Sequence, residues 1–234
     1  TATCAATRWQ NLANGLDYTN IPVNSTGGKI HAFKIDLKEY KLSLARAQDI
    51  GSKSANVITL AIQSGGIIAI NGGFFDPFHT PLGLRIENGQ LLNPIRPISW
   101  WGVFYILNNK HAYITSMKNF TLSPNIDFAI QSGPRLIVNG STPTLKDDYA
   151  ARSALCIDRQ GNVIIAITES IAITPEVFAG LLRRPTTQNG LGCYNALNLD
   201  GGSSSQLYAV IGNFHLMIPS FSNVADAVVV VPRK

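Results

Sequence analysis

The chain lacks long hydrophobic runs: the longest, among them Ala227 to Val231, have the length of a strand. A membrane-spanning helix needs about 20 apolar residues in a row, so the sequence predicts no transmembrane segment. Charged residues are also scarce, at 14% of the chain against 45% hydrophobic residues. This balance is typical of a packed globular protein and argues against disorder.

Patterns for binding zinc or nucleic acid are missing as well. The cysteines include no C-x-x-C pair, and the four histidines are widely dispersed, which argues against a zinc site. The net charge is +5, but the basic residues are scattered, with only Arg183-Arg184 adjacent. No basic stretch is interleaved with aromatic residues, so we expect no nucleic-acid partner. The charge fits either a mildly basic surface or a site for anionic substrates such as phosphates or cell-envelope polymers.

The three cysteines are Cys4, Cys156 and Cys193. Cys156 lies in an apolar run, where a cysteine usually behaves as a small buried hydrophobe. Cys4 and Cys193 could form a disulfide in an oxidising compartment. The chain begins at Thr1 and not at Met, which is consistent with a signal segment that has been removed. We therefore expect a periplasmic or secreted protein.

The hydrophobic pattern favours strands over helices. Residues 33–37 alternate apolar and polar side chains, and runs at 67–70, 207–211, 214–218 and 227–231 have strand length. Turn-like segments at 108–110 and 159–162 predict two hairpins. Helices are expected over 52–63 and from Thr174-Pro175, where a capping residue precedes proline.

These elements predict an α+β fold, a mostly antiparallel twisted β-sheet with a few interspersed helices. Residues 1–28 are polar and are expected to form an N-terminal extension. Residues 29–234 then form a single domain, because no linker, repeat or low-complexity segment divides them.

Two glycine-rich segments follow predicted buried strands. The first is NGGFFD at 71–76, and the second is NLDGGSSS at 198–205. Paired glycines let the backbone approach a ligand closely, so the two segments suggest two lips of one site. Asp200 could act as a general acid, a general base or a metal ligand. The alternatives are a serine-rich Asx-turn around Asp200 and core packing for Phe74 and Phe75.

Two further segments carry polar residues beside strands. One is QSGPR at 131–135, and the other is ARSA at 151–154. The guanidinium of Arg152 has a planar fork suited to phosphate or carboxylate groups, although a lone arginine is more often structural. His79 and Glu169 are weaker candidates, each readily explained as a loop or strand-end residue.

Together these segments resemble the phosphodiester glycosidase family. The matching pieces are NGGFF at 71–75, PLGL at 81–84, QSGPRLIVNG at 131–140, ARSALCID at 151–158 and LGCYNALNLDGGSSSQL at 191–207. They occur in the family's order and extend the resemblance over about residues 30–232. Small single-domain bacterial members of the family, often found in the cell envelope, are the most similar.

The resemblance implies a hydrolase that cleaves between the anomeric carbon of a sugar and a phosphodiester oxygen. The expected catalytic residues are Asp200, Arg152 and Asn71. The expected substrate-binding residues are Gly72, Gly73, Phe74, Phe75, Gln131, Ser132, Gly133, Arg135, Gly201, Gly202, Ser203 and Ser204. The expected partner is a sugar phosphate or an envelope glycan.

A second carboxylate is not evident, although many glycosidases use a pair. Asp76 and Glu169 are the candidates. A phosphate leaving group needs less acid assistance than an alcohol, so one carboxylate with Arg152 could suffice.

Two other functions are compatible with the sequence. A phosphodiesterase would cut the P–O bond, with a divalent cation near Asp200 as its cofactor. A glycan-binding envelope protein would keep the pocket without turnover. A serine hydrolase is disfavoured, because the serines at 203–205 lie in no G-x-S-x-G segment.

Overall fold

The computed structural model describes residues 6–23 and 27–233, whose strands form three sheets. The largest sheet has seven strands in the order β1-β2-β3-β13-β12-β14-β11. Their bounds are β1 Gln10–Ala13, β2 Leu16–Val23, β3 Gly28–Ile35, β11 Arg135–Ile137, β12 Ser153–Asp158, β13 Val163–Glu169 and β14 Cys193–Asn198. Neighbouring strands pair antiparallel throughout this sheet.

The other two sheets have five strands each. One has the order β7-β6-β10-β8-β9, and the other β16-β15-β5-β17-β4. The first contains β6 Arg85–Glu87, β7 Gln90–Asn93, β8 Gly102–Leu107, β9 Ala112–Ser116 and β10 Ile126–Ser132. The second contains β4 Tyr40–Arg46, β5 Ile68–Asn71, β15 Leu207–Ile211, β16 Phe214–Ile218 and β17 Asp226–Pro232. Their pairings are also antiparallel, which confirms the predicted fold class.

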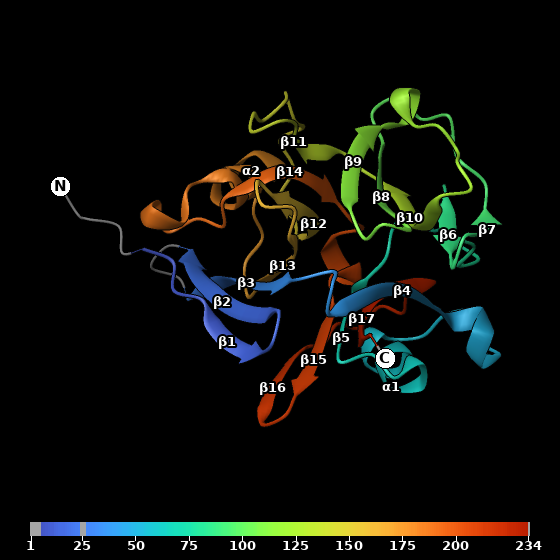
Figure 1. Ribbon diagram of the computed structural model, residues 1–234, viewed down its shortest axis with the longest axis horizontal. Coiled ribbons are helices and arrows are strands. Elements are labelled where there is room, and N and C mark those ends of the chain that lie inside the picture. The colour runs from blue at the N-terminus through green and yellow to red at the C-terminus, as the bar shows by residue number, and fades with distance from the viewer. Residues whose placement is uncertain (1–5, 24–26, 234) are drawn as a thin grey trace.

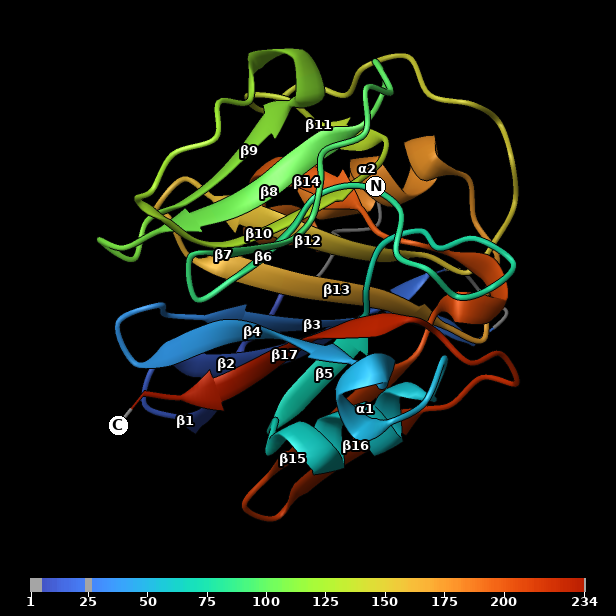
Figure 2. The same ribbon diagram turned by 90° about the vertical axis from the view of Figure 1, so that its right-hand side faces the viewer.

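The three sheets meet around one large hydrophobic core. In Figure 2, β8 and β9 lie above β12 and β13, and β4, β5 and β17 lie below β3. Each sheet contributes buried side chains to the shared core, among them Phe33, Phe128 and Val228. The alternation of apolar residues along these strands thus places one face of each sheet at a common junction.

Two α-helices cover outer faces of the sheets. Helix α1, Val57–Ser64, packs on the sheet of β5 and β17, and helix α2, Pro175–Arg183, packs on the sheet of β14. The short 3-10 turns are η1 Ala47–Ile50, η2 Met117–Asn119, η3 Thr186–Gln188 and η4 Gly202–Ser204. Among the described residues, no helix has the length and apolar character needed to cross a membrane.

A capping residue marks the start of each α-helix. Helix α2 begins as predicted, with the Thr174 hydroxyl accepting a hydrogen bond from Val177 N. Helix α1 begins later than the expected residue 52, because Asn56 caps it by accepting from Thr59 N at 2.8 Å. Ala55, just before this cap, is instead held in a β-bridge with Val224.

The described part of the expected N-terminal extension contributes two strands to the largest sheet. Strand β2 pairs with β3 from Leu16 opposite Ile35 to Val23 opposite Gly28, and β1 pairs with β2 at the sheet edge. Leu16 and Ile21 are fully buried. These two residues face opposite sides of the sheet, and each belongs to a different hydrophobic cluster, so β2 is packed on both faces despite the polar composition of the segment.

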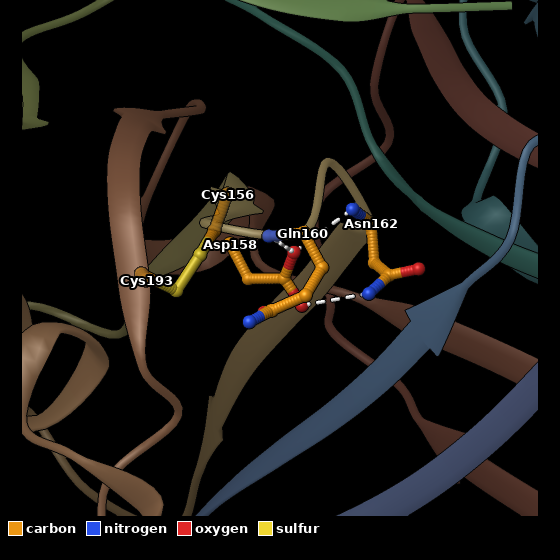
Figure 3. Close-up of a disulfide and its surroundings, with 5 residues drawn as sticks. All are labelled: Cys156, Asp158, Gln160, Asn162 and Cys193. Atoms are coloured by element: carbon orange, nitrogen blue, oxygen red, sulfur yellow. Dashed lines mark hydrogen bonds between the residues drawn. A yellow bond between two sulfur atoms is a disulfide. The ribbon is translucent and has the colours of Figure 1, made fainter.

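A disulfide joins Cys156 of β12 to Cys193 of β14 (Figure 3), with the two Cα atoms 5.9 Å apart. The suggested pairing of Cys193 with Cys4 is therefore wrong, and Cys4 itself lies outside the described residues. Cys156 is buried as predicted, but as half of a cross-link. The two strands are neighbours whose register shifts beside these cysteines, and no periodicity in the sequence shows which strands pair.

Candidate functional site

A cavity of about 720 Å³ opens where β12 begins and β14 ends. We call it the Asp200 cavity. Its lining comes from six separate parts of the chain: Phe74, Trp100, Gly133, Pro134, Thr144, Leu145, Lys146, Asp148, Ala150, Arg152, Pro175, Asn198, Asp200, Gly201 and Gly202. Figure 1 shows β12, β14 and helix α2 side by side in this half of the molecule.

The structure brings the two glycine-rich segments into direct contact. Asp200 N donates to Gly72 O at 3.2 Å, and Asn71 Nδ2 donates to Asp200 O at 2.7 Å. Asn71 is fully buried, and its Oδ1 accepts from Ser153 Oγ at 2.7 Å. Asn71 therefore fixes the backbone that carries Asp200, and its own side chain does not line the cavity.

Asp200 is the carboxylate that the second glycine-rich segment contributes to the cavity lining. Burial raises its pKa above the ordinary value, and the negative charge of Asp226 raises it further. Hydrogen bonds from the Ser204 side chain and from Gly201 N oppose this rise, the latter at 2.9 Å. A carboxylate with a raised pKa is a stronger base than an ordinary aspartate, as general acid–base catalysis requires.

Arg152 enters the same cavity from the start of β12. Its Nε donates to Ile173 O at 3.0 Å, and its Nη2 donates to Asp148 Oδ2 at 3.0 Å. These bonds fix the guanidinium plane and leave Nη1 without an acceptor among the described residues. A Cβ added at Gly201 would lie 4.0 Å from Nη1, so this donor stands beside the Asp200 turn and is available to an anionic ligand.

An aromatic wall closes one side of the cavity. Phe74 lines it together with Trp100, and the ring of Phe74 lies 5.0 Å from that of Trp101. Trp100 is 55% exposed, so its face is open to a ligand. Phe75 points elsewhere: it packs on the α1 core and stacks on His79, with ring centres 5.0 Å apart.

The segment 131–135 divides between the cavity and the interior. Gly133 and Pro134 line the cavity. Gln131 is fully buried, and its amide bonds to Leu84 N and Arg96 N. Ser132 is buried and Arg135 lies in β11, and neither lines the cavity. Gln131 thus anchors the segment, leaving the next two residues to contact a ligand.

The second glycine segment is held against β12 by its backbone. Gly202 N donates to Ala151 O at 2.8 Å, and a Cβ at Gly201 would lie 2.9 Å from the same oxygen. Glycine at 201 therefore permits the close approach. Ser204 is buried and bonds to Asp200, whereas Ser203 is exposed and does not line the cavity.

Behind the cavity lies a buried ion pair that sequence reasoning missed. Arg85 Nε donates to Asp226 Oδ2 at 2.7 Å, and both side chains are 1% exposed. The pair explains why the NGGFF segment has glycine at both 72 and 73. A Cβ at Gly72 would lie 1.9 Å from Asp226 Oδ1, and one at Gly73 would lie 2.9 Å from Arg85 Nη2.

Several lining residues were also missed. Trp100, Lys146 and Asp148 lie in irregular segments where no local pattern marks a site. Asn198 was visible at the end of the second strand and is 3% exposed. Its Oδ1 is buried without a hydrogen bond from the described residues, which a ligand hydroxyl or amide could supply.

The expected second carboxylates do not line this cavity. Asp76 accepts bonds from Phe78 N and Thr80 N within its own turn. Glu169 pairs with His31 Nε2 at 2.9 Å. Asp148 is the other carboxylate in the lining. Within residues 6–23 and 27–233, no group of three or more His, Cys, Asp or Glu side chains is placed to hold a metal ion.

The sequence matches a family profile and a protein of known sequence. The profile of the phosphodiester glycosidase family matches residues 64–231. "Uncharacterized protein YigE" of Escherichia coli K12 is 37% identical over 117 residues, which cover 44% of this chain and 44% of that protein. The match therefore spans less than half of the YigE protein.

Solved structures share the fold at low sequence identity. The catalytic domain of zebrafish N-acetylglucosamine-1-phosphodiester alpha-N-acetylglucosaminidase, auto-inhibited by its pro-peptide, superposes with a TM-score of 0.69 at 17% identity. That alignment covers 100% of this chain and 86% of the zebrafish domain. A hypothetical protein from Synechocystis superposes with a TM-score of 0.65 at 18% identity, over 97% of this chain and 64% of the other. The matching profile spans more than half of the chain, and this protein belongs to the phosphodiester glycosidase family.

Proposed function

We propose that this protein hydrolyses the glycosidic bond of a sugar-1-phosphodiester. The observation that carries the proposal is the pairing of Asp200 and Arg152 in one cavity with an aromatic wall. The family and the shared fold support the same reaction class. The reaction adds water across one bond: the sugar leaves as a free hemiacetal, and the phosphate leaves as a monoester.

In this proposal Asp200 is the general base. Its carboxylate takes a proton from a water molecule that attacks the anomeric carbon, and its raised pKa makes it suited to hold that proton. The bond from the anomeric carbon to the phosphate oxygen breaks, and its electron pair leaves with the phosphate. Because that phosphate is a weakly basic leaving group, the reaction needs little help from a second acid.

Arg152 and the aromatic wall bind the two halves of the substrate. The free Nη1 of Arg152 would contact the phosphate and stabilise the charge that develops as it leaves. Phe74 and Trp100 offer flat faces to the sugar ring, and Asn198 Oδ1 would accept a hydrogen bond from a sugar hydroxyl or amide. Asn71 would act by holding Asp200, because its own polar atoms are engaged inside the protein.

We further propose that the protein works in the periplasm or outside the cell, on an envelope glycan or a related sugar phosphate. The Cys156–Cys193 disulfide supports this location, because disulfides persist in oxidising compartments and are rare in the cytosol.

The deciding experiment is hydrolysis of the methyl diester of N-acetylglucosamine-1-phosphate in water enriched in heavy oxygen, followed by phosphorus NMR and mass spectrometry. We expect methyl phosphate without label and free sugar with the label at its anomeric oxygen. Label on phosphorus, or release of sugar-1-phosphate, would show P–O cleavage and replace the proposal with a phosphodiesterase. A parallel reaction in a metal chelator tests the divalent cation, and the Asp200→Asn variant controls for contaminating hydrolases.

A further inference from the structure

A second cavity of about 590 Å³ lies at the opposite ends of the same two strands. We call it the Trp9 cavity. Asp158, at the end of β12, and Cys193, at the start of β14, contribute to its lining. Figure 3 shows this corner, with the disulfide beside the turn that follows β12. The proposed reaction does not use this cavity.

Two cations stack on aromatic rings in the lining of the Trp9 cavity. The guanidinium of Arg159 lies over the Tyr194 ring, 4.2 Å from its centre. The ammonium of Lys34 lies over the Trp9 ring at 4.6 Å. Arg183, from the last turn of α2, adds a third positive charge to the lining. Stacked cations and aromatic faces suit a ligand that carries both an anionic group and a ring.

The negative groups nearby are largely engaged by the protein itself. Both Asp158 oxygens accept bonds within their own turn, Oδ1 from Gln160 N and Asn162 N, and Oδ2 from Asn162 Nδ2. Asp17 pairs with Lys34 at 3.2 Å. Arg159 and Arg183 form no ion pair with other described residues, and both are exposed. The cavity therefore has two cations available for an anion.

The backbone at Gly140 fixes the positions of Tyr194 and Arg159. Gly140 N donates to Tyr194 O at 2.7 Å, and Gly140 has a φ of 80°, which favours glycine. A Cβ at this position would lie 3.2 Å from the Tyr194 ring and 3.6 Å from Arg159 Nη2. The ring and the guanidinium are thus held against the β11–β12 connection.

The same connection and helix α2 reach both cavities. Pro175 at the start of α2 lines the Asp200 cavity, and Arg183 at its end lines the Trp9 cavity. Residues eight apart in a helix are separated by about 12 Å along its axis. Likewise, Gly140 lines the Trp9 cavity, and Lys146 lines the Asp200 cavity. A linear ligand that follows α2 could therefore occupy both.

We propose that the Trp9 cavity binds an anionic unit of a polymeric sugar phosphate while another unit of the same chain occupies the Asp200 cavity. This inference rests on the proposed function for the identity of the reacting unit. A substrate that occupies both cavities would be a polymer with repeated negative charges, because a single sugar phosphate is too short to reach across α2. Charge attraction at both cavities would hold the chain along the helix.

Another basic cavity shows what distinguishes the Trp9 cavity. It measures about 430 Å³ and is lined by Lys38, Lys41, Lys110 and Arg233, with no aromatic ring among its lining residues. Its Arg233 Nε is engaged by the carbonyls of Leu37 and Tyr40. It provides a matched control, because the same number of positive charges can be removed there.

The test uses binding without turnover, on the Asp200→Asn protein. The probes are a synthetic oligomer of four N-acetylglucosamine-1-phosphate units joined by phosphodiester bonds and the single-unit methyl diester. The protein contains three tryptophans, so its indole N–H groups give three NMR signals, from Trp9, Trp100 and Trp101, assignable with Trp9→Phe. We expect both probes to shift the Trp100 signal, and only the oligomer to shift that of Trp9.

Calorimetry supplies the second readout. We expect the oligomer to bind about tenfold more tightly than the methyl diester, and Arg159→Gln with Arg183→Gln to remove most of that advantage. The control, Lys38→Gln with Lys110→Gln, should change oligomer binding by less than about twofold, because it removes only distant charge. Equal losses in the two double variants, or an unmoved Trp9 signal at saturating oligomer, would overturn the inference. Cleavage of the methyl diester by the unaltered protein is scored separately, so the proposed function can stand if the second cavity fails, and the reverse.

Discussion

Asp200 and Asp226 lie on either side of Gly72 and have opposite surroundings. Asp200 lines the cavity, and its backbone N donates to Gly72 O at 3.2 Å. Asp226 is 1% exposed and paired with Arg85, and its backbone O accepts from Gly72 N at 2.9 Å. One aspartate is thus open to a ligand, while the other is enclosed as half of an ion pair.

Two aspartates thus have different roles at one turn. The charge of Asp226 raises the pKa of Asp200, and its contact with Gly72 positions the strand end that bonds to Asp200. Asp226 therefore acts on the site from behind, through charge and through backbone, without reaching the cavity. If this division is correct, variants of the two residues should affect different measurements.

Asp200→Asn should produce the largest effect, a loss of about 10³-fold in kcat on the methyl diester, because the amide cannot take a proton from water. This corresponds to about 4 kcal/mol of transition-state stabilisation. The measurement is steady-state kinetics, with circular dichroism to confirm the fold. Retention of full turnover would remove Asp200 from the chemistry.

Asp226→Asn should act mainly on stability. It leaves the buried Arg85 charge without its partner, which we expect to lower the free energy of unfolding by about 3 kcal/mol. Urea unfolding followed by fluorescence measures this change. The double variant Arg85→Met with Asp226→Leu removes both charges and should recover part of the loss. A single variant as stable as the unaltered protein would contradict the assigned role of the pair.

Gly72→Ala tests the close contact between the two aspartate-bearing segments. The new Cβ would lie 1.9 Å from Asp226 Oδ1, so the segments must separate, at a cost of about 2 kcal/mol. Both urea stability and turnover should fall, because the hydrogen bond from Asn71 Nδ2 to Asp200 O moves with the strand end. Gly180→Ala is the matched control: that glycine lies in α2 with open space around it, and alanine there should stabilise the protein slightly.

The smallest expected effect is the pH dependence of stability at Asp200. Because its pKa is raised in the folded protein, its contribution to stability is present below the unfolded-state pKa of about 3.9 and is lost as the pH rises through the folded-state value. Asp200→Asn removes that loss. At neutral pH the variant should therefore melt at a higher temperature than the unaltered protein. The difference should vanish at low pH, and a constant offset would point to another cause.

Sequence patterns predicted the local elements well where the signal was itself local. The hairpin of β12 and β13, the capped start of α2 and the two glycine turns all depend on neighbouring residues. One glycine turn led to Asp200 and the segment at 151–154 led to Arg152, and the structure places both residues in one cavity.

The features that the sequence did not predict depend on which strands become neighbours. Arg85 and Asp226 are separated by 141 positions, and nothing in the residues around either one indicates the other. The same holds for the Cys156–Cys193 pairing and for Trp100 and Asp148, which reach the cavity from irregular segments. Alternation of side chains tells which face of a strand is buried, but it does not tell what lies against that face.

Strand β17 is the last strand along the chain, yet it lies inside its sheet between β5 and β4. Strand β5, which ends at Asn71, therefore gains its second neighbouring strand only after residues 226–232 have been synthesised. Such distant pairing is a slow step in folding. The consequence is an order of assembly in which the sheet that carries Asn71 is completed last. A nascent chain, or one clipped before residue 226, lacks both strand β17, which pairs with β5, and the Asp226 carbonyl that accepts from Gly72 N.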